Sequence, residues 1–284
     1  MGGTGRRRLP EGTFVWFAFC ALVAATAVML HADLRNMMRQ QALSPFVSPA
    51  SVRMDRPEKN DQVRPYLPAA RPVAPDEALP GGTPDRPHDF REAEPMTFRF
   101  GSGGTLYAEG TITPGTAAMF EAVLGGARAR GLAEIVLHSP GGSVTDAVAM
   151  ARAIRAGGLA THVLEDGYCA SSCPLVFAGG TTRIAHPKAW IGVHQVYAVE
   201  SAIGSLSEGM DQAQRVSAEA QFLLDELGVD PRVWVHAMAT PKSKLYLFTP
   251  DELTKYHLAT GLEPAGPSQG SGKVADVAAE GAAR

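Results

Sequence analysis

The chain has 284 residues, which is long enough for one domain of ordinary size with extensions. Its formal net charge is −3 and 19% of its residues are charged, with no basic stripe of the kind that follows a nucleic-acid backbone. The three cysteines and eight histidines do not form the paired clusters that zinc sites use. Composition therefore points away from a nucleic-acid partner and from a metal site, and it leaves the class of function open.

A basic cluster followed by an apolar run opens the chain. Arg6, Arg7 and Arg8 precede Thr13–Leu30, an uncharged and mostly apolar run of 18 residues. Such a run is just long enough to cross a bilayer as a helix. The arginines predict a cytoplasmic N-terminus at residues 1–12 and a transmembrane anchor at residues 13–30. A cleaved signal peptide is the alternative, although the run is long for one.

Whether the apolar run is a retained anchor or a cleaved signal peptide, it places the bulk of the chain outside the cytoplasm. We therefore expect a single-pass protein of the bacterial inner membrane with its folded domain in the periplasm. Residues 41–95 hold 11 of the 21 prolines, a density that blocks helices and central strands. We expect a semi-extended, Pro-rich linker at 31–95, an ordered domain at 96–262 and a disordered Gly/Ala-rich tail at 263–284.

Strands and helices alternate through the ordered part. Strands are expected at Thr105–Thr113, Glu134–His138, Leu159–Leu164, Arg183–Ala185 and Ala189–His194. Helices are expected at Thr116–Arg130, from Ser143, at Ser172–Ala178, at Ser201–Leu227, from Asp230 and from Thr249. This alternation predicts βαβ units and a mostly parallel sheet. Sites in such folds lie beyond the carboxyl ends of the strands.

Three segments at predicted strand ends carry residues suited to acyl-transfer chemistry. The turn Ser139–Gly142 leaves backbone N–H groups bare before a helix, where they can bind an oxyanion. Ser171 and Ser172 begin a short apolar helix, and His194 ends a strand from which it can act as a general base. The plainer interpretations are a glycine-containing helix start, an N-cap serine and a structural histidine. The motifs of α/β-hydrolases, P-loops and dinucleotide sites are absent, and no cofactor is expected.

The order of these three segments resembles that of the Clp protease proteolytic subunit and its wider crotonase superfamily, over residues 105–262. Within that superfamily the likeness is greatest to membrane-anchored, periplasmic Clp-like serine proteases of unknown substrate. The resemblance implies an α/β Clp-like (crotonase) fold of repeated ββα/βαβ units, preceded by one N-terminal transmembrane helix and a Pro-rich linker. It also implies a homo-oligomer that acts on a peptide or protein substrate.

The resemblance also assigns roles to individual residues. It implies that Ser171 is the nucleophile and His194 the base, with the backbone N–H groups of Gly142 and Ser172 forming the oxyanion hole. Ser172 as nucleophile is the alternative, which requires a one-residue shift at the turn. The pair Cys169 and Cys173 either forms a disulfide in an oxidising compartment or remains as two small buried thiols.

The sequence departs from the family where a third, orienting aspartate is expected. The stretch 242–248, just before the helix that begins at Thr249, contains no carboxylate. Loss of this acid costs about 10⁴ in rate in the serine-protease template. Three explanations stand: a Ser–His dyad oriented by a backbone carbonyl or by Ser243, another carboxylate such as Glu200 or Asp211, or a degenerate site.

These observations leave three hypotheses of function. The first is a membrane-anchored, extracytoplasmic serine hydrolase, a peptidase that uses a Ser–His pair and a backbone oxyanion hole. The second is a catalytically degenerate Clp-like binding or assembly module, which the missing acid motivates. The third is a crotonase-type acyl-thioester enzyme, in which a serine and a histidine at these positions are not expected.

Overall fold

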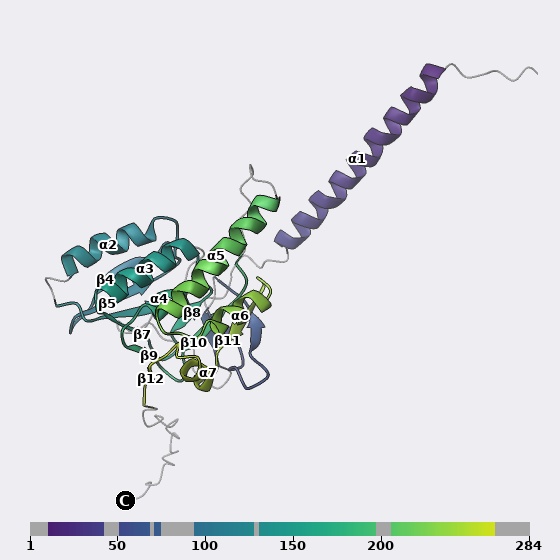
Figure 1. Ribbon diagram of the computed structural model, residues 1–284. Helices are drawn as coiled ribbons and strands as arrows, with labels where there is room; N and C mark the ends of the chain where they lie inside the picture. The colour runs from purple at the N-terminus through teal and green to yellow at the C-terminus, as the bar shows by residue number, and fades with distance from the viewer. Residues whose placement is uncertain are drawn as a thin grey trace, which may run out of the picture. The chain divides into compact units, whose positions relative to one another are not determined.

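The structure is a computed structural model of the chain, and it describes residues 11–42, 51–68, 71–74, 94–127, 131–196 and 206–264. The chain forms two compact units, Met1–Pro49 and Ala50–Arg284. Within the described residues, the first unit contains one helix, and the second contains every strand and the remaining helices (Figure 1).

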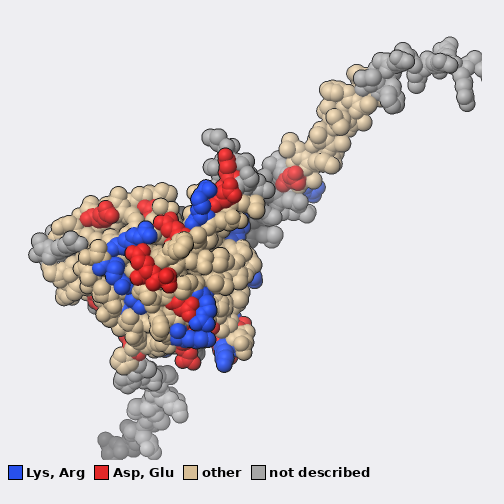
Figure 2. Space-filling model, viewed as in Figure 1, with Lys and Arg blue, Asp and Glu red and all other residues tan. Residues whose placement is uncertain are grey.

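The helix of the first unit, α1 (Glu11–Ala42), contains the predicted anchor. Its window Trp16–Asp33 has a mean hydropathy of 1.6 and is long and apolar enough to cross a membrane by length and composition. A signal sequence near an N-terminus meets the same criterion. Figure 2 shows the described part of α1 as uncharged over most of its length. The helix continues past residue 30 because residues 31–42 contain neither proline nor glycine.

A six-stranded sheet forms one half of the second unit. Its order is β12-β9-β7-β6-β5-β4, and all neighbouring strands are parallel except β4 and β5. The four central strands fall where the sequence predicts them, and β6 is apolar because it is buried along most of its length. The strands are β4 (Thr97–Phe100), β5 (Thr105–Glu109), β6 (Glu134–His138), β7 (Ala160–Val163), β9 (Arg183–Ala185) and β12 (Gly261–Leu262).

Six helices accompany the sheets within the described residues. Helices α2 and α3 lie side by side, and α3 also contacts α4 and α5 (Figure 1). Two of the predicted helix starts have their caps in place: the Ser143 hydroxyl accepts from the Asp146 N–H before α3, and Thr249 forms a capping box with Glu252 before α7. The helices are α2 (Thr116–Ala127), α3 (Val144–Ala156), α4 (Cys173–Ala178), α5 (Leu206–Glu226), α6 (Arg232–Ala239) and α7 (Pro250–Lys255).

A second, four-stranded sheet holds the strands that lead to the predicted site. Its order is β2-β11-β10-β8, with β8 and β10 parallel and the other neighbours antiparallel. A bridge between Ser139 and Cys169 connects the end of β6 to β8. The strands are β2 (Val63–Pro65), β8 (Tyr168–Ala170), β10 (Trp190–Val193) and β11 (Lys244–Leu247). The described strands thus form these two sheets and a separate two-stranded pair, β1 with β3, where the sequence predicted one sheet.

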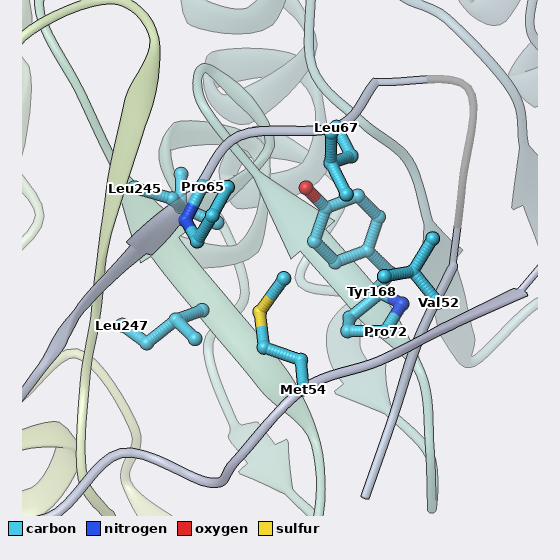
Figure 3. Close-up of a pocket in the computed structure, with 8 residues that line it drawn as sticks. All are labelled: Val52, Met54, Pro65, Leu67, Pro72, Tyr168, Leu245 and Leu247. Atoms are coloured by element: carbon cyan, nitrogen blue, oxygen red, sulfur yellow. The ribbon is translucent and has the colours of Figure 1, made fainter. Parts of the chain in front are cut away.

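The N-terminal part of the second unit corrects the expected linker at 31–95. Residues 51–68 and 71–74, here called the strap, pack on the second sheet instead of running free. Strand β1 (Ser51–Arg53) pairs with β3 (Arg71–Val73), and β2 pairs with β11. Strap side chains surround the Tyr168 ring, together with leucines of β11 (Figure 3). Pro65 is tolerated because β2 is an edge strand, where a missing N–H breaks no ladder.

The ordered body therefore begins before residue 96. At its other end, β12 and the backbone bond from Glu263 N to Ala185 O hold the chain against β9. The rest of the expected linker, at 43–50, 69–70 and 75–93, lies outside the described residues, as does the expected tail from residue 265 onward.

Candidate active site

The glycine turn after β6 leaves one backbone N–H aimed away from its neighbours. Ile112 N donates to Gly141 O at 2.8 Å, and Ser143 N donates to Ile112 O at 2.6 Å. Because alternate residues of an extended chain direct their N–H groups to opposite sides, the Gly142 N–H points away from Ile112. Gly142 has φ +138°, and a Cβ there would lie 2.2 Å from the Ile112 carbonyl oxygen. Only glycine fits this position.

The serine turn after β8 is strained and lies against the glycine turn. Ser171 has φ +62°, a left-handed conformation that costs an L-residue about 1–2 kcal/mol. Its backbone N–H donates to Gly192 O at 2.9 Å. A Cβ on Gly141 would lie 2.5 Å from both the Ala170 oxygen and the Ser171 Cβ. The absence of a side chain at 141 therefore lets the two turns touch.

The two adjacent serines have different surroundings. Ser171 lines a pocket, whereas Ser172 is not among the residues that line it and is 1% exposed. Ser172 is the residue before α4, and its hydroxyl has no hydrogen-bond partner among the described residues. The structure thus presents the hydroxyl of Ser171, and not that of Ser172, to the pocket.

His194 lies beside the serine turn because β8 and β10 are parallel neighbours. Ala170 pairs with Gly192, so Ser171 and His194 both follow the carboxyl ends of adjacent strands. His194 is 2% exposed. Burial lowers the pKa of its imidazole from 6.5 to about 4, against an opposing hydrogen bond with the Gln195 backbone. The ring is therefore neutral at pH 7 and able to accept a proton.

One pocket of about 550 Å³ brings Gly142, Ser171 and His194 together. None of the described residues that line it has a charged side chain. The rest of its wall comes from the strap, the loop after β5, the start of α3, the residues after β10, and helices α5 and α6. These wall residues are Tyr66, Thr111, Ile112, Thr113, Pro114, Ser143, Val144, Thr145, Gln195, Val196, Gln212, Ala213, Val216 and Trp234. The size and lining are those of a small-molecule or peptide side-chain site.

A disulfide bond brackets Ser171. Cys169 and Cys173 are joined, with Cα atoms 5.1 Å apart, and both are fully buried. The disulfide joins strand β8 to the first residue of α4. It restrains the turn in which Ser171 takes its left-handed conformation.

No described carboxylate occupies the place of a third catalytic residue. Asp211 is exposed on α5 and does not line the pocket, and Glu200 lies outside the described residues. Ser243 is also exposed and does not itself line the pocket, although its carbonyl oxygen accepts from the N–H of the lining residue Tyr66 at 3.1 Å. Glu252, which follows the stretch 242–248, is engaged by the Tyr246 hydroxyl at 2.7 Å and by its own helix cap. The adjacent Gln195 backbone opposes the lowering of the His194 pKa, and neither Ser243 nor Asp211 lines the pocket with it.

Tyr66 is the pocket residue that sequence reasoning missed. Its ring centroid lies 4.4 Å from that of His194, and its hydroxyl donates to the Pro140 carbonyl at 2.7 Å. The available signal was slight, a pair of apolar residues, Tyr66 and Leu67, between two prolines. Proline density concealed that these residues pack against the domain.

The architecture and the pocket together define a class of protein. It is an α/β domain with a strained serine turn, a neutral histidine and a glycine turn at the ends of neighbouring strands. Residues 128–226 match the family model described as Clp protease, a region that runs from before β6 to the end of α5 and includes all three features. The chain therefore has a Clp protease-like fold.

Two solved structures are similar to the chain over a little more than half of its length. One is a mutant of ClpP1 from Listeria monocytogenes, with 16% identity, a TM-score of 0.45, and coverage of 56% of this chain and 90% of that one. The other is a mutant of the membrane-bound stomatin-specific protease 1510-N, with 18% identity, a TM-score of 0.44, and coverage of 55% and 76%. No curated protein matches the chain significantly.

Proposed function

We propose that this protein is a membrane-anchored serine peptidase that cleaves peptides or proteins outside the cytoplasm. One observation carries the proposal: Gly142, Ser171 and His194, from three separate segments, line a single pocket within the region that matches the Clp protease family. Strained backbone at a nucleophile and a desolvated base are both features of functional sites.

In the proposed mechanism the Ser171 hydroxyl oxygen attacks the scissile carbonyl carbon, and His194 takes the hydroxyl proton. The resulting oxyanion accepts from the N–H groups of Gly142 and Ser172, neither of which has another described partner. His194 then gives its proton to the leaving amine as the C–N bond breaks. A water molecule, deprotonated by His194, attacks the acyl-enzyme and releases the second product with the serine restored.

The proposed base works without a carboxylate. Because the pKa of His194 is about 4, the imidazole is neutral across the physiological range, and the negative charge that develops nearby favours its protonation in the transition state. In this proposal the neighbouring Gln195 backbone, which opposes the lowering of the pKa, takes the place of the carboxylate in orienting the ring. Backbone orientation supplies direction without the extra negative charge of an aspartate, so we expect a slower enzyme than one with a complete triad.

The proposed location follows from the leader and the cysteines. Helix α1 anchors the chain in a bacterial inner membrane, with Arg6–Arg8 on the cytoplasmic side and the domain in the periplasm. The bond between Cys169 and Cys173 suits an oxidising compartment. Relatives of this fold class form rings, so we propose that this chain also acts as a homo-oligomer.

Labelling with a fluorophosphonate probe tests the proposal directly. The full-length protein in detergent is compared with Ser171→Ala, Ser172→Ala and His194→Ala, each checked for folding by thermal denaturation. We expect labelling of the wild type and of Ser172→Ala, and none of the other two variants. A folded wild type that resists the probe would overturn the proposal.

The absence of a described carboxylate at the pocket supports one other function, a binding module that has lost catalysis. Such a protein would resist the probe yet bind peptides in the same pocket. Binding of an immobilised peptide library by the wild type, weakened by Trp234→Ala in the pocket wall, would then identify it.

A further inference from the structure

We propose that Tyr66 is a positioning residue of the active site, which holds the His194 ring and the glycine turn in their working arrangement. Through Tyr66, the strap then contributes to the catalytic site. This inference rests on the proposed peptidase function.

The first contact is between the two rings. The centroids of Tyr66 and His194 are 4.4 Å apart and the ring planes are inclined by 38°. An aromatic ring at this distance blocks rotation of the imidazole on one side, and it adds a packing contact of its own. Orientation of the imidazole is the task that a third catalytic residue performs in a triad.

The second contact is with the glycine turn that forms the proposed oxyanion hole. The Tyr66 hydroxyl donates to the Pro140 carbonyl oxygen at 2.7 Å. Pro140 directly precedes Gly141 and Gly142, whose backbone forms the proposed oxyanion hole. One side chain therefore contacts both the base and the turn that binds the developing charge. Misplacement of either by about 1 Å is enough to reduce a rate substantially.

Tyr66 is itself held firmly. Its backbone N–H donates to Ser243 O at 3.1 Å, continuing the pairing of β2 with β11. Behind it, strap side chains enclose the Tyr168 ring with only about 10 Å³ of cavity left between them (Figure 3). The side chains that converge there are Val52, Met54, Pro65, Leu67 and Pro72 of the strap, with Leu245 and Leu247 of β11.

The ring of Tyr66 also keeps water away from His194. Tyr66 and His194 are the two titratable side chains among the described residues that line the pocket, and Tyr168 lies behind Tyr66. No charged group therefore faces the imidazole from α3, α5 or α6 within that lining. Desolvation is the main cause of its lowered pKa, so removal of the covering ring is expected to raise that pKa toward 6.5.

The test compares Tyr66→Phe, Tyr66→Ala and, as a control, Val63→Ala in the full-length protein. Val63 lies on β2, the strand that Tyr66 directly follows, is 49% exposed and lines neither pocket. Tyr66→Phe keeps the ring but loses the bond to Pro140. The rate constant of fluorophosphonate labelling is measured against pH, and the pKa of His194 is followed by NMR in ¹⁵N-histidine-labelled protein.

We expect Tyr66→Ala to label at least tenfold more slowly than the wild type at pH 8, with the acid limb of the profile moved upward by one to two pH units. Tyr66→Phe should lose several-fold in labelling rate and keep the wild-type acid limb, and Val63→Ala should keep both the wild-type rate and the wild-type limb. If Tyr66→Ala does not fold, the rate loss in Tyr66→Phe decides.

Two negative results separate the claims. Wild-type rate and an unmoved acid limb in both Tyr66 variants would overturn the positioning role and leave the peptidase proposal standing. A folded wild type that does not label at all would overturn the peptidase proposal, and the role of Tyr66 with it.

Discussion

Replacement of Gly142 by alanine is expected to damage folding and chemistry together. The new Cβ would lie 2.2 Å from the Ile112 carbonyl oxygen, so the backbone must move by more than 1 Å to restore contact distance. That movement breaks the pair of backbone bonds between Ile112 and the glycine turn, at about 1 kcal/mol each. The φ of +138° adds about 1–3 kcal/mol for a side chain in a region reserved for glycine.

The sum is a loss of about 3–5 kcal/mol in the free energy of unfolding. Displacement of one oxyanion donor should also lower the labelling rate of Ser171 by about 10²–10³. Urea denaturation measures the first quantity and fluorophosphonate kinetics the second, on the same preparation.

Gly158→Ala is the matched control. Gly158 also has a positive φ, +67°, but a Cβ there meets no atom within 4 Å. It should cost only about 1 kcal/mol and leave labelling unchanged. Equal destabilisation by the two alanines would show that the close approach of Ile112 is unimportant and would refute the reasoning.

Three further results are expected. Because the pKa of His194 is about 4 in the folded protein and 6.5 when exposed, the unfolded state takes up the proton first. The contribution of His194 to the free energy of unfolding should be constant above pH 6.5 and fall as the pH drops toward 4, by on the order of 3 kcal/mol. Urea titrations of His194→Gln should lack this fall. The double variant Cys169→Ala/Cys173→Ala should lose about 2 kcal/mol, the entropy of a short closed loop, and label more slowly at Ser171; unchanged labelling would contradict a restraining role. Arg183→Met should lose on the order of 3 kcal/mol by calorimetry, since the guanidinium donates to three backbone carbonyls, and Arg183→Lys should recover part of the loss.

Local signals explain what the sequence predicted well. The glycine turn before α3 and the capping box at Thr249 depend on residues within four positions of one another, and both are present where expected. The run Glu134–His138 was recognisable by the consecutive apolar residues Ile135–Leu137 at its centre, because a strand buried on both faces carries apolar side chains on both. The same locality placed Ser171 and His194 at strand ends, which parallel pairing then brought side by side.

Long-range pairing explains what the sequence could not provide. Strand β8 has three residues and β2 contains a proline, so neither has the length or composition of a recognisable strand. The contact between Tyr66 and His194 depends on β2 pairing with β11, and no periodicity in residues 51–74 indicates that partner. The burial that lowers the pKa of His194 likewise depends on packing from several elements and leaves no trace in the local sequence.

The pairing of β2 with β11 also sets the order in which the domain can become complete. The strap is synthesised before the rest of the domain, yet Pro65 must wait for Lys244, near the other end of the chain. Contacts between residues so far apart in sequence form late, because closing the intervening loop has a large entropic cost. Until the strap docks, His194 lacks its aromatic cover. The proposed positioning of His194 by Tyr66 is therefore established only after the rest of the domain has formed.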